Sequence, residues 1–199
     1  IVKRRGRYMQ EAVPVGAGAM SAILGLDASS VKQACDESGN GEVVAPANLN
    51  APRQVVIAGD REAVHRAGEV AKRMGAKRVI SLTVSAPFHC ALMQPVADRL
   101  APELRRLSAT DPHIPVVANV DAEPKRDAQA SINALIQQIA SPVLWEQVIR
   151  RLASDGSRTY VEVGPGSVLT GLMKKIDRTL RAVAVDKLPT LNHAKEFIG

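Results

Sequence analysis

Aromatic residues are scarce in this sequence of 199 residues, which has one Trp, two Tyr and two Phe. Proteins that recognise single-stranded nucleic acid stack its bases on aromatic side chains set among basic residues. No aromatic residue interrupts a basic run here, so we expect no nucleic-acid partner. The formal net charge of +6 still permits an acidic partner, either a protein or an anionic small molecule.

Cysteine is also scarce. Cys35 and Cys90 are too few and too far apart for a zinc site or a disulfide framework. The four histidines, at positions 65, 89, 113 and 193, show no metal-ligand spacing, so we expect no metal. A reducing, cytoplasmic compartment is the expected location.

Long hydrophobic runs are absent as well. No apolar run approaches the length of about 20 residues that a membrane-spanning helix needs, and no signal-peptide hydrophobic region follows the basic residues 1–7. We therefore expect no membrane association. The sequence lacks an initiator Met and opens on a helical pattern, which predicts a true start further upstream.

What the sequence does contain is a regular alternation of strand and helix patterns, long enough for one large domain or two small ones. Residues 19–84 follow the order β-α-β-β-α-β, which is the ferredoxin-like arrangement. In this unit, strands are expected over 19–26, 43–49, 54–58 and 78–84, and Asp27 and Asp60 are expected to cap the two helices.

The remaining residues, 1–18 and 85–199, predict a parallel α/β layer into which the ferredoxin-like subdomain 19–84 is inserted. A buried strand is expected over 112–120, and a helix is expected to restart at Ser141. Other expected elements are helices over 3–14, 90–107, 127–139 and 168–176 and a strand over 160–163. The predicted fold class is α/β.

His89 is the first candidate for chemistry. It follows an apolar strand pattern and Pro87, whose ring fixes the backbone, and a helix pattern begins just after it. A histidine at the exit of a strand is where α/β enzymes place a general base. A solvated loop histidine is the alternative.

Five segments then combine into a resemblance. They are residues 5–12 (RGRYMQEA), 18–20 (GAM), 48–59 (NLNAPRQVVIAG), 84–93 (VSAPFHCALM) and 162–166 (EVGPG). In this order the sequence resembles the bacterial malonyl-CoA:acyl carrier protein transacylases of fatty acid synthesis, over essentially all its length. The resemblance implies a hydrolase-like acyltransferase core that carries the ferredoxin-like insertion.

The nucleophile of that family is a serine in a Gly-His-Ser-x-Gly elbow, upstream of the opening helix. No G-x-S-x-G occurs in the 199 residues. Ser167, after Gly164-Pro165-Gly166, lacks the second glycine and is expected to be a helix N-cap. We therefore expect this sequence to be the C-terminal two-thirds of such an enzyme.

The resemblance implies ping-pong transfer of malonate from CoA to the phosphopantetheine thiol of acyl carrier protein, without a cofactor. His89 falls on the catalytic histidine, which exchanges a proton with the serine and the leaving thiolate. Arg5 falls on the arginine that pairs with the free malonyl carboxylate. Gln138 matches the residue whose backbone carbonyl holds the histidine. A helix-terminal glutamine without a special role is the alternative for Gln138.

Three further residues are expected near the substrate. Asn48 and Asn50 would hydrogen-bond CoA or the pantetheine arm, or they only form the hairpin turn. Phe88 would narrow the acyl pocket; related polyketide acyltransferases carry a phenylalanine there, whereas many bacterial transacylases carry a small residue. The choice between malonyl and methylmalonyl groups stays open. Cys90 is expected to pack in the core rather than act as a nucleophile, since neighbouring side chains in an extended chain point apart.

Malonyl transfer is the favoured function. A polyketide-type acyltransferase domain, a noncatalytic fragment that binds CoA or carrier protein, and a hydrolase are the alternatives. The resemblance also implies a monomer, with basic residues on the cleft rim facing an acidic carrier protein.

Overall fold

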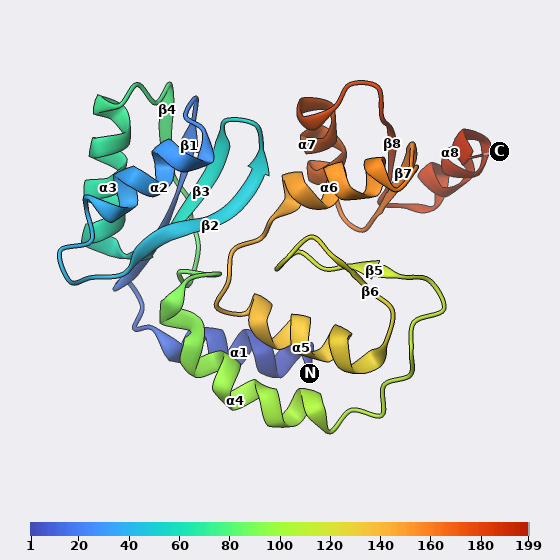
Figure 1. The fold of residues 1–199 in the computed structure, drawn as a ribbon, viewed down its shortest axis with the longest axis horizontal. Coiled ribbons are helices and arrows are strands. Elements are labelled where there is room, and N and C mark those ends of the chain that lie inside the picture. The colour runs from blue at the N-terminus through green and yellow to red at the C-terminus, as the bar shows by residue number, and fades with distance from the viewer. Residues whose placement is uncertain (199) are drawn as a thin grey trace.

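A computed structural model describes residues 1–198. A four-stranded antiparallel sheet covered by two helices forms one part of the fold, and a group of helices with two short sheets forms the rest (Figure 1). Among the described residues, no helix is both long enough and apolar enough to cross a bilayer.

The four-stranded sheet has the ferredoxin-like arrangement that the sequence predicts. Its elements are β1 (Gly18–Leu24), α2 (Ala28–Asp36), β2 (Val44–Ala51), β3 (Gln54–Asp60), α3 (Arg61–Arg73) and β4 (Arg78–Ser81). The strand order is β2-β3-β1-β4, and all neighbours are antiparallel. Strand β4 ends at Ser81 rather than at residue 84.

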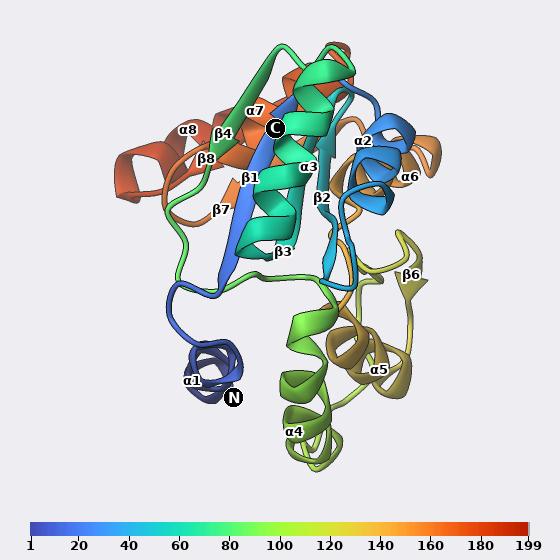
Figure 2. The ribbon, with the colours of Figure 1, turned by 90° about the vertical axis from the view of Figure 1, so that its left-hand side faces the viewer.

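Helices α2 and α3 cover one face of this sheet (Figure 2). Their apolar stripes meet Ile23, Val55 and Ile57 of the strands in one buried cluster. The Asp27 side chain accepts a hydrogen bond from the Ser30 amide at 2.8 Å and so caps α2 as expected. The predicted Asp60 cap is wrong, because the Asp60 carboxylate accepts from the amide of Val43 instead.

The other face of the sheet packs against the segment that contains His89. Met20, Ala47 and Ala58 form a buried cluster there with Cys90. The Cys90 side chain is 2% exposed, and burial raises the pKa of its thiol to about 11. Cys90 therefore packs in the core, as expected, and joins the sheet to the following helices.

Three helices form a second core beside the sheet. These are α1 (Val2–Ala12), α4 (Gln94–Arg105), which follows the short 3-10 helix η1 (Ala91–Met93), and α5 (Ala128–Gln138). Tyr8 and Met9 of α1, Leu100 of α4 and Ile132 of α5 are buried together. This packing brings the start of the chain next to the residues after His89.

The C-terminal part contains a parallel pair of strands. Its elements are α6 (Trp145–Ser154), β7 (Thr159–Val163), α7 (Val168–Ile176), β8 (Arg181–Val185) and α8 (Leu188–Ile198). Strands β7 and β8 are parallel along their full length and form the only parallel sheet within residues 1–198. Helix α7 begins after Ser167, but the Ser167 side chain makes no cap. The Glu162 carboxylate accepts from the amides of Leu169 and Thr170 instead.

Two predicted elements differ from the structure. The expected buried strand over 112–120 is reduced to β5 (Val116–Val117), which pairs only with β6 (Pro124–Lys125) in the described part of the chain. Ile114 is 79% exposed there. An apolar run indicates burial only when another layer covers it, and here Val116 is exposed as well while residues 117–120 are only half-buried.

The helix expected to restart at Ser141 begins only at Trp145. The backbone of Val143 instead stays extended beside β2, donating to Ala47 O and accepting from Leu49 N, both at 2.8 Å. Two tertiary hydrogen bonds thus replace a helical turn. The division into 1–18 with 85–199 and 19–84 stays a prediction.

Gly18 offers a test of how tightly the sheet and the His89 segment are packed. A Cβ atom at Gly18 would lie 2.5 Å from Cδ and Cγ of Pro87. Gly18→Ala should therefore lower the free energy of unfolding by about 1–3 kcal/mol, measured by urea denaturation, because the rigid proline ring cannot move aside alone.

Gly171→Ala is the matched control. A Cβ at Gly171, inside α7, meets no atom within 4 Å. Alanine is favoured over glycine in a helix by about 1 kcal/mol, so this variant should be as stable as the wild type or more so. Equal stability of Gly18→Ala and the wild type would contradict the close packing.

Candidate active site

The backbone presents His89 in an unusual conformation. Its φ is +61°, in the left-handed region that costs a residue with a side chain about 1 kcal/mol or more. Pro87, two residues before His89, and Cys90, directly after it, are both buried. Such strain persists where surrounding contacts enforce it, and it often marks a functional position.

The imidazole of His89 is held by a backbone carbonyl. Its Nδ1 lies 3.0 Å from the carbonyl oxygen of Gln138 at the end of α5. A carbonyl oxygen can only accept, so Nδ1 carries the proton and Nε2 keeps a free lone pair. This is the contact that the resemblance implies, and the catalytic roles of both residues stay predictions.

The surroundings of His89 favour its neutral form. Burial lowers the pKa of His89 below its usual 6.5, and the positive charge of Arg5 lowers it further. Hydrogen bonding to the carbonyls of Gln138 and Ser141 acts in the opposite direction and raises the pKa. The net shift is downward, so at neutral pH His89 can accept a proton through Nε2.

Arg5 differs from the arginines beside it on α1. Arg4 pairs with Glu103 at 2.7 Å and Arg7 with Glu11 at 3.4 Å. The half-buried Arg5 has no carboxylate within 4 Å in the described part of the chain, and burial lowers its pKa from an ordinary value of 12.5. A guanidinium remains charged under these conditions, so a cation without a carboxylate partner among the described residues acts electrostatically on a His89 ring whose neutral form is favoured.

Helix α1 is fixed in place by contacts with α4 and with the His89 segment. The Tyr8 hydroxyl donates to Glu103 at 2.6 Å, and the Arg99 guanidinium lies 3.7 Å from the centre of the Tyr8 ring. The Gln10 amide donates to the Ser85 hydroxyl, four residues before His89. No sequence pattern indicated these contacts, because each joins residues that are far apart in the chain.

The structure places Asn48 and Asn50 within β2, both half-buried. The hairpin turn follows at Pro52 and Arg53, so turn formation does not explain the asparagines. Asn48 is bridged to Val143. Phe88 packs against both the sheet cluster and the helical core. Substrate contacts of these three residues stay predictions.

Gln138 also uses its side chain, which sequence reasoning missed. The amide Nε2 donates to the carbonyls of Ser141 at 2.9 Å and Pro142 at 3.1 Å. A cavity of about 350 Å³ lies beside Gln138 and is lined mainly by apolar residues of β5 and α5. No group of three His, Cys, Asp or Glu residues able to hold a metal ion occurs among the described residues.

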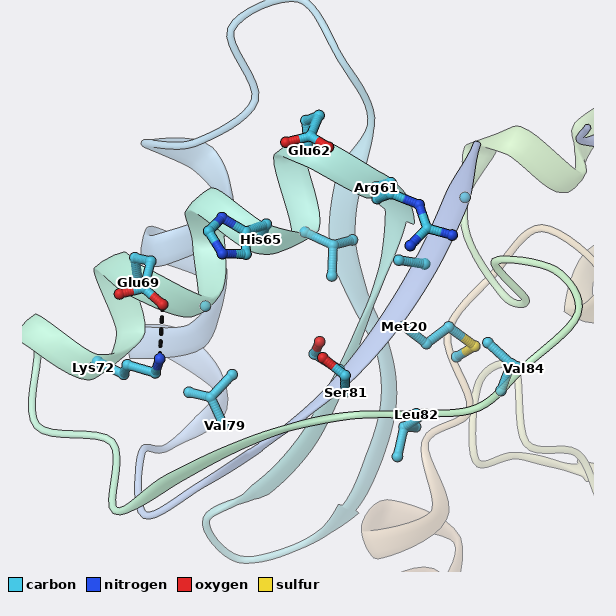
Figure 3. Close-up of a pocket in the computed structure, with 15 residues that line it drawn as sticks. Met20, Arg61, Glu62, His65, Glu69, Lys72, Val79, Ser81, Leu82 and Val84 are labelled. Atoms are coloured by element: carbon cyan, nitrogen blue, oxygen red, sulfur yellow. Dashed lines mark hydrogen bonds and ion pairs between the residues drawn. The ribbon is translucent and has the colours of Figure 1, made fainter. Parts of the chain in front are cut away.

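A larger groove, of about 480 Å³, lies elsewhere, between α3 and the strands β1 and β4 (Figure 3). Its charged residues have mixed signs, and Lys72 is already paired with Glu69 at 2.7 Å. None of the candidate site residues lines it. The candidate active site is therefore the region of His89 and not this groove.

The charge of Arg5 acting on His89 can be measured directly. Arg5→Gln should raise the pKa of His89, because a nearby cation disfavours the imidazolium and its removal relieves that repulsion. The pKa should stay below 6.5, since burial is the larger cause of the shift. A pH titration of the His89 ring by NMR gives both values. Arg7→Gln is the control, and equal titration curves for the two variants would contradict the assignment.

Comparison with known proteins identifies the family of this chain. Residues 1–193 match the acyl transferase domain family. The malonyl CoA-acyl carrier protein transacylase of Salmonella typhimurium is 51% identical over 194 residues, which are 98% of this chain and 63% of that protein. The Bacillus subtilis enzyme of the same name is 45% identical, over 97% of this chain and 61% of its own length.

Solved structures are equally similar. An acyl carrier protein S-malonyltransferase from Vibrio cholerae has a TM-score of 0.94 at 48% identity and covers 97% of this chain and 63% of its own. A malonyl-transacylase solved in complex with its type II PKS acyl-carrier protein has a TM-score of 0.96 at 48% identity and covers 98% of this chain and 63% of its own. The chain spans less than two thirds of the length of these relatives. Its fold is that of the acyltransferases, and the chain belongs to the acyl transferase domain family.

Proposed function

We propose that this chain provides the histidine and the arginine of a malonyl-CoA:acyl carrier protein transacylase. The observation that carries the proposal is the pairing of a neutral, carbonyl-held His89 with the unpaired cation of Arg5. The serine nucleophile is proposed to lie outside the 199 residues. Malonyl-CoA is the proposed substrate and acyl carrier protein the proposed partner; the names of the relatives support both.

The proposed reaction has two steps that use the same proton path. In the first, His89 Nε2 takes the serine proton as the serine attacks the malonyl thioester, and the proton then passes to the CoA thiolate. In the second, the phosphopantetheine thiol gives its proton to His89 and attacks the malonyl ester, and His89 returns that proton to the serine oxygen as the ester bond breaks. No metal or other cofactor takes part in the proposal.

Arg5 is proposed to select the acyl group. Malonate differs from acetate by a free carboxylate, and a guanidinium binds a carboxylate through two parallel hydrogen bonds. Because Arg5 has no carboxylate partner of its own within residues 1–198, the substrate would supply one. Asn48, Asn50 and Phe88 are proposed to line the path of the pantetheine arm and the acyl pocket.

Two further proposals concern the cellular location and the oligomeric state of the protein. Cys35 and Cys90 are both free and buried, which supports a reducing, cytoplasmic location. A monomer is proposed on the resemblance alone. A noncatalytic protein that only binds CoA or carrier protein is the alternative, and it predicts binding without transfer.

The test is malonyl transfer from malonyl-CoA to holo acyl carrier protein, with the protein purified at its native length. His89→Asn should lower the rate by about 10²- to 10⁴-fold, as expected for loss of a general base. Asparagine is chosen because it tolerates a left-handed backbone. Intact mass after incubation with malonyl-CoA should reveal a malonyl adduct on the serine. Binding of malonyl-CoA without adduct or transfer would favour the noncatalytic alternative.

Arg5→Ala tests selectivity in the same assay. Loss of charge-assisted hydrogen bonds of ~1.5–3 kcal/mol should reduce the preference for malonyl over acetyl thioesters by about 10- to 100-fold. Arg7→Ala, on the same helix but paired with Glu11, should keep the preference. Unchanged selectivity in Arg5→Ala would refute the role of Arg5 and leave that of His89 standing.

A further inference from the structure

Gln138 takes part in the site through its backbone and its side chain at once. Its carbonyl oxygen accepts from His89 Nδ1 at 3.0 Å. Its side-chain Nε2 donates to the carbonyls of Ser141 and Pro142, at 2.9 and 3.1 Å. The residue that holds the histidine therefore also holds the loop that follows it, from Ile139 to Leu144.

The carbonyl of Ser141 lies in both networks. It accepts from Gln138 Nε2, and it is also one of the two backbone carbonyls whose hydrogen bonding favours a protonated His89. The amide of Gln138 thus holds a second carbonyl that acts on the pKa of His89.

The same loop is hydrogen-bonded to strand β2. Val143 donates to Ala47 O and accepts from Leu49 N, both at 2.8 Å, and so brackets Asn48 on either side. Pro142 has no amide proton to donate. Its carbonyl accepts from Gln138 Nε2, and the next backbone group along the chain, the amide of Val143, already bonds to β2. One short loop therefore connects the support of His89 to the strand that carries Asn48.

We propose that the side-chain amide of Gln138 is a positioning group, which keeps the His89 ring and the Asn48 segment of β2 in one arrangement. The inference deepens the proposed function, since it concerns the same histidine. It assigns to the amide a role separate from that of the backbone carbonyl, which any residue could supply. Both of its donor hydrogens have acceptors, whereas the neighbouring Gln137 is exposed.

The test compares Gln138→Met with Gln137→Met in the protein at its native length, by NMR. Methionine matches glutamine in length but cannot donate a hydrogen bond, and the backbone carbonyl remains. The ¹⁵N shifts of the His89 ring report its tautomer. In Gln138→Met, the single Nδ1–H tautomer should become a mixture, whereas Gln137→Met should keep it.

Amide exchange gives a second readout. The amides of Val143 and Leu49 should exchange about fivefold faster or more in Gln138→Met, because both hydrogen bonds of the side-chain amide are lost, while the amide of buried Ile57 should keep its rate. Gln138→Glu, which keeps the length but loses the donors, decides the outcome if Gln138→Met does not fold. An unchanged tautomer and unchanged exchange at Val143 and Leu49 would overturn the proposal. Neither readout requires transfer, so failure of the proposed function would be seen separately.

Discussion

The hydrogen bond between His89 Nδ1 and the carbonyl of Gln138 depends on residues 49 positions apart, and much of the fold serves to bring them together. Helix α4 starts just after His89 and packs on α5, whose last residue is Gln138. The sheet holds the other side of the segment through Cys90 and Phe88. The bond in turn fixes the tautomer of the ring, which a histidine in an open loop would not keep.

Burial of His89 and the positive charge of Arg5 both lower the pKa of the imidazole. Burial lowers the pKa of His89 and that of Arg5, yet only the histidine is close enough to neutrality to lose its proton. The result is a neutral imidazole under the influence of a permanent cation. Under the proposed function, a substrate carboxylate bound by Arg5 would offset the positive charge that lowers the pKa of His89.

The sequence was sufficient for most of the ferredoxin-like unit, because its helices and strands have clear periodicities and Asp27 caps α2 as expected. It pointed to Arg5, His89 and Gln138 only through motif register, and their roles stay predictions. It failed at residues 141–144, where bonds to β2 replace a helical turn, and at residues 112–120, where Ile114 and Val116 of an apolar run are exposed. It also missed the side chain of Gln138, since a hydrogen bond to a nearby loop leaves no pattern in the sequence.

The two cysteines have a practical consequence. Burial raises the pKa of the Cys35 thiol to about 12 and that of Cys90 to about 11, so neither forms an appreciable amount of thiolate near neutral pH. Alkylating reagents attack the thiolate and need access to it. A cysteine introduced on the surface can therefore carry a fluorophore or a spin label at a single position while both native thiols stay in place, even with one of them next to the histidine.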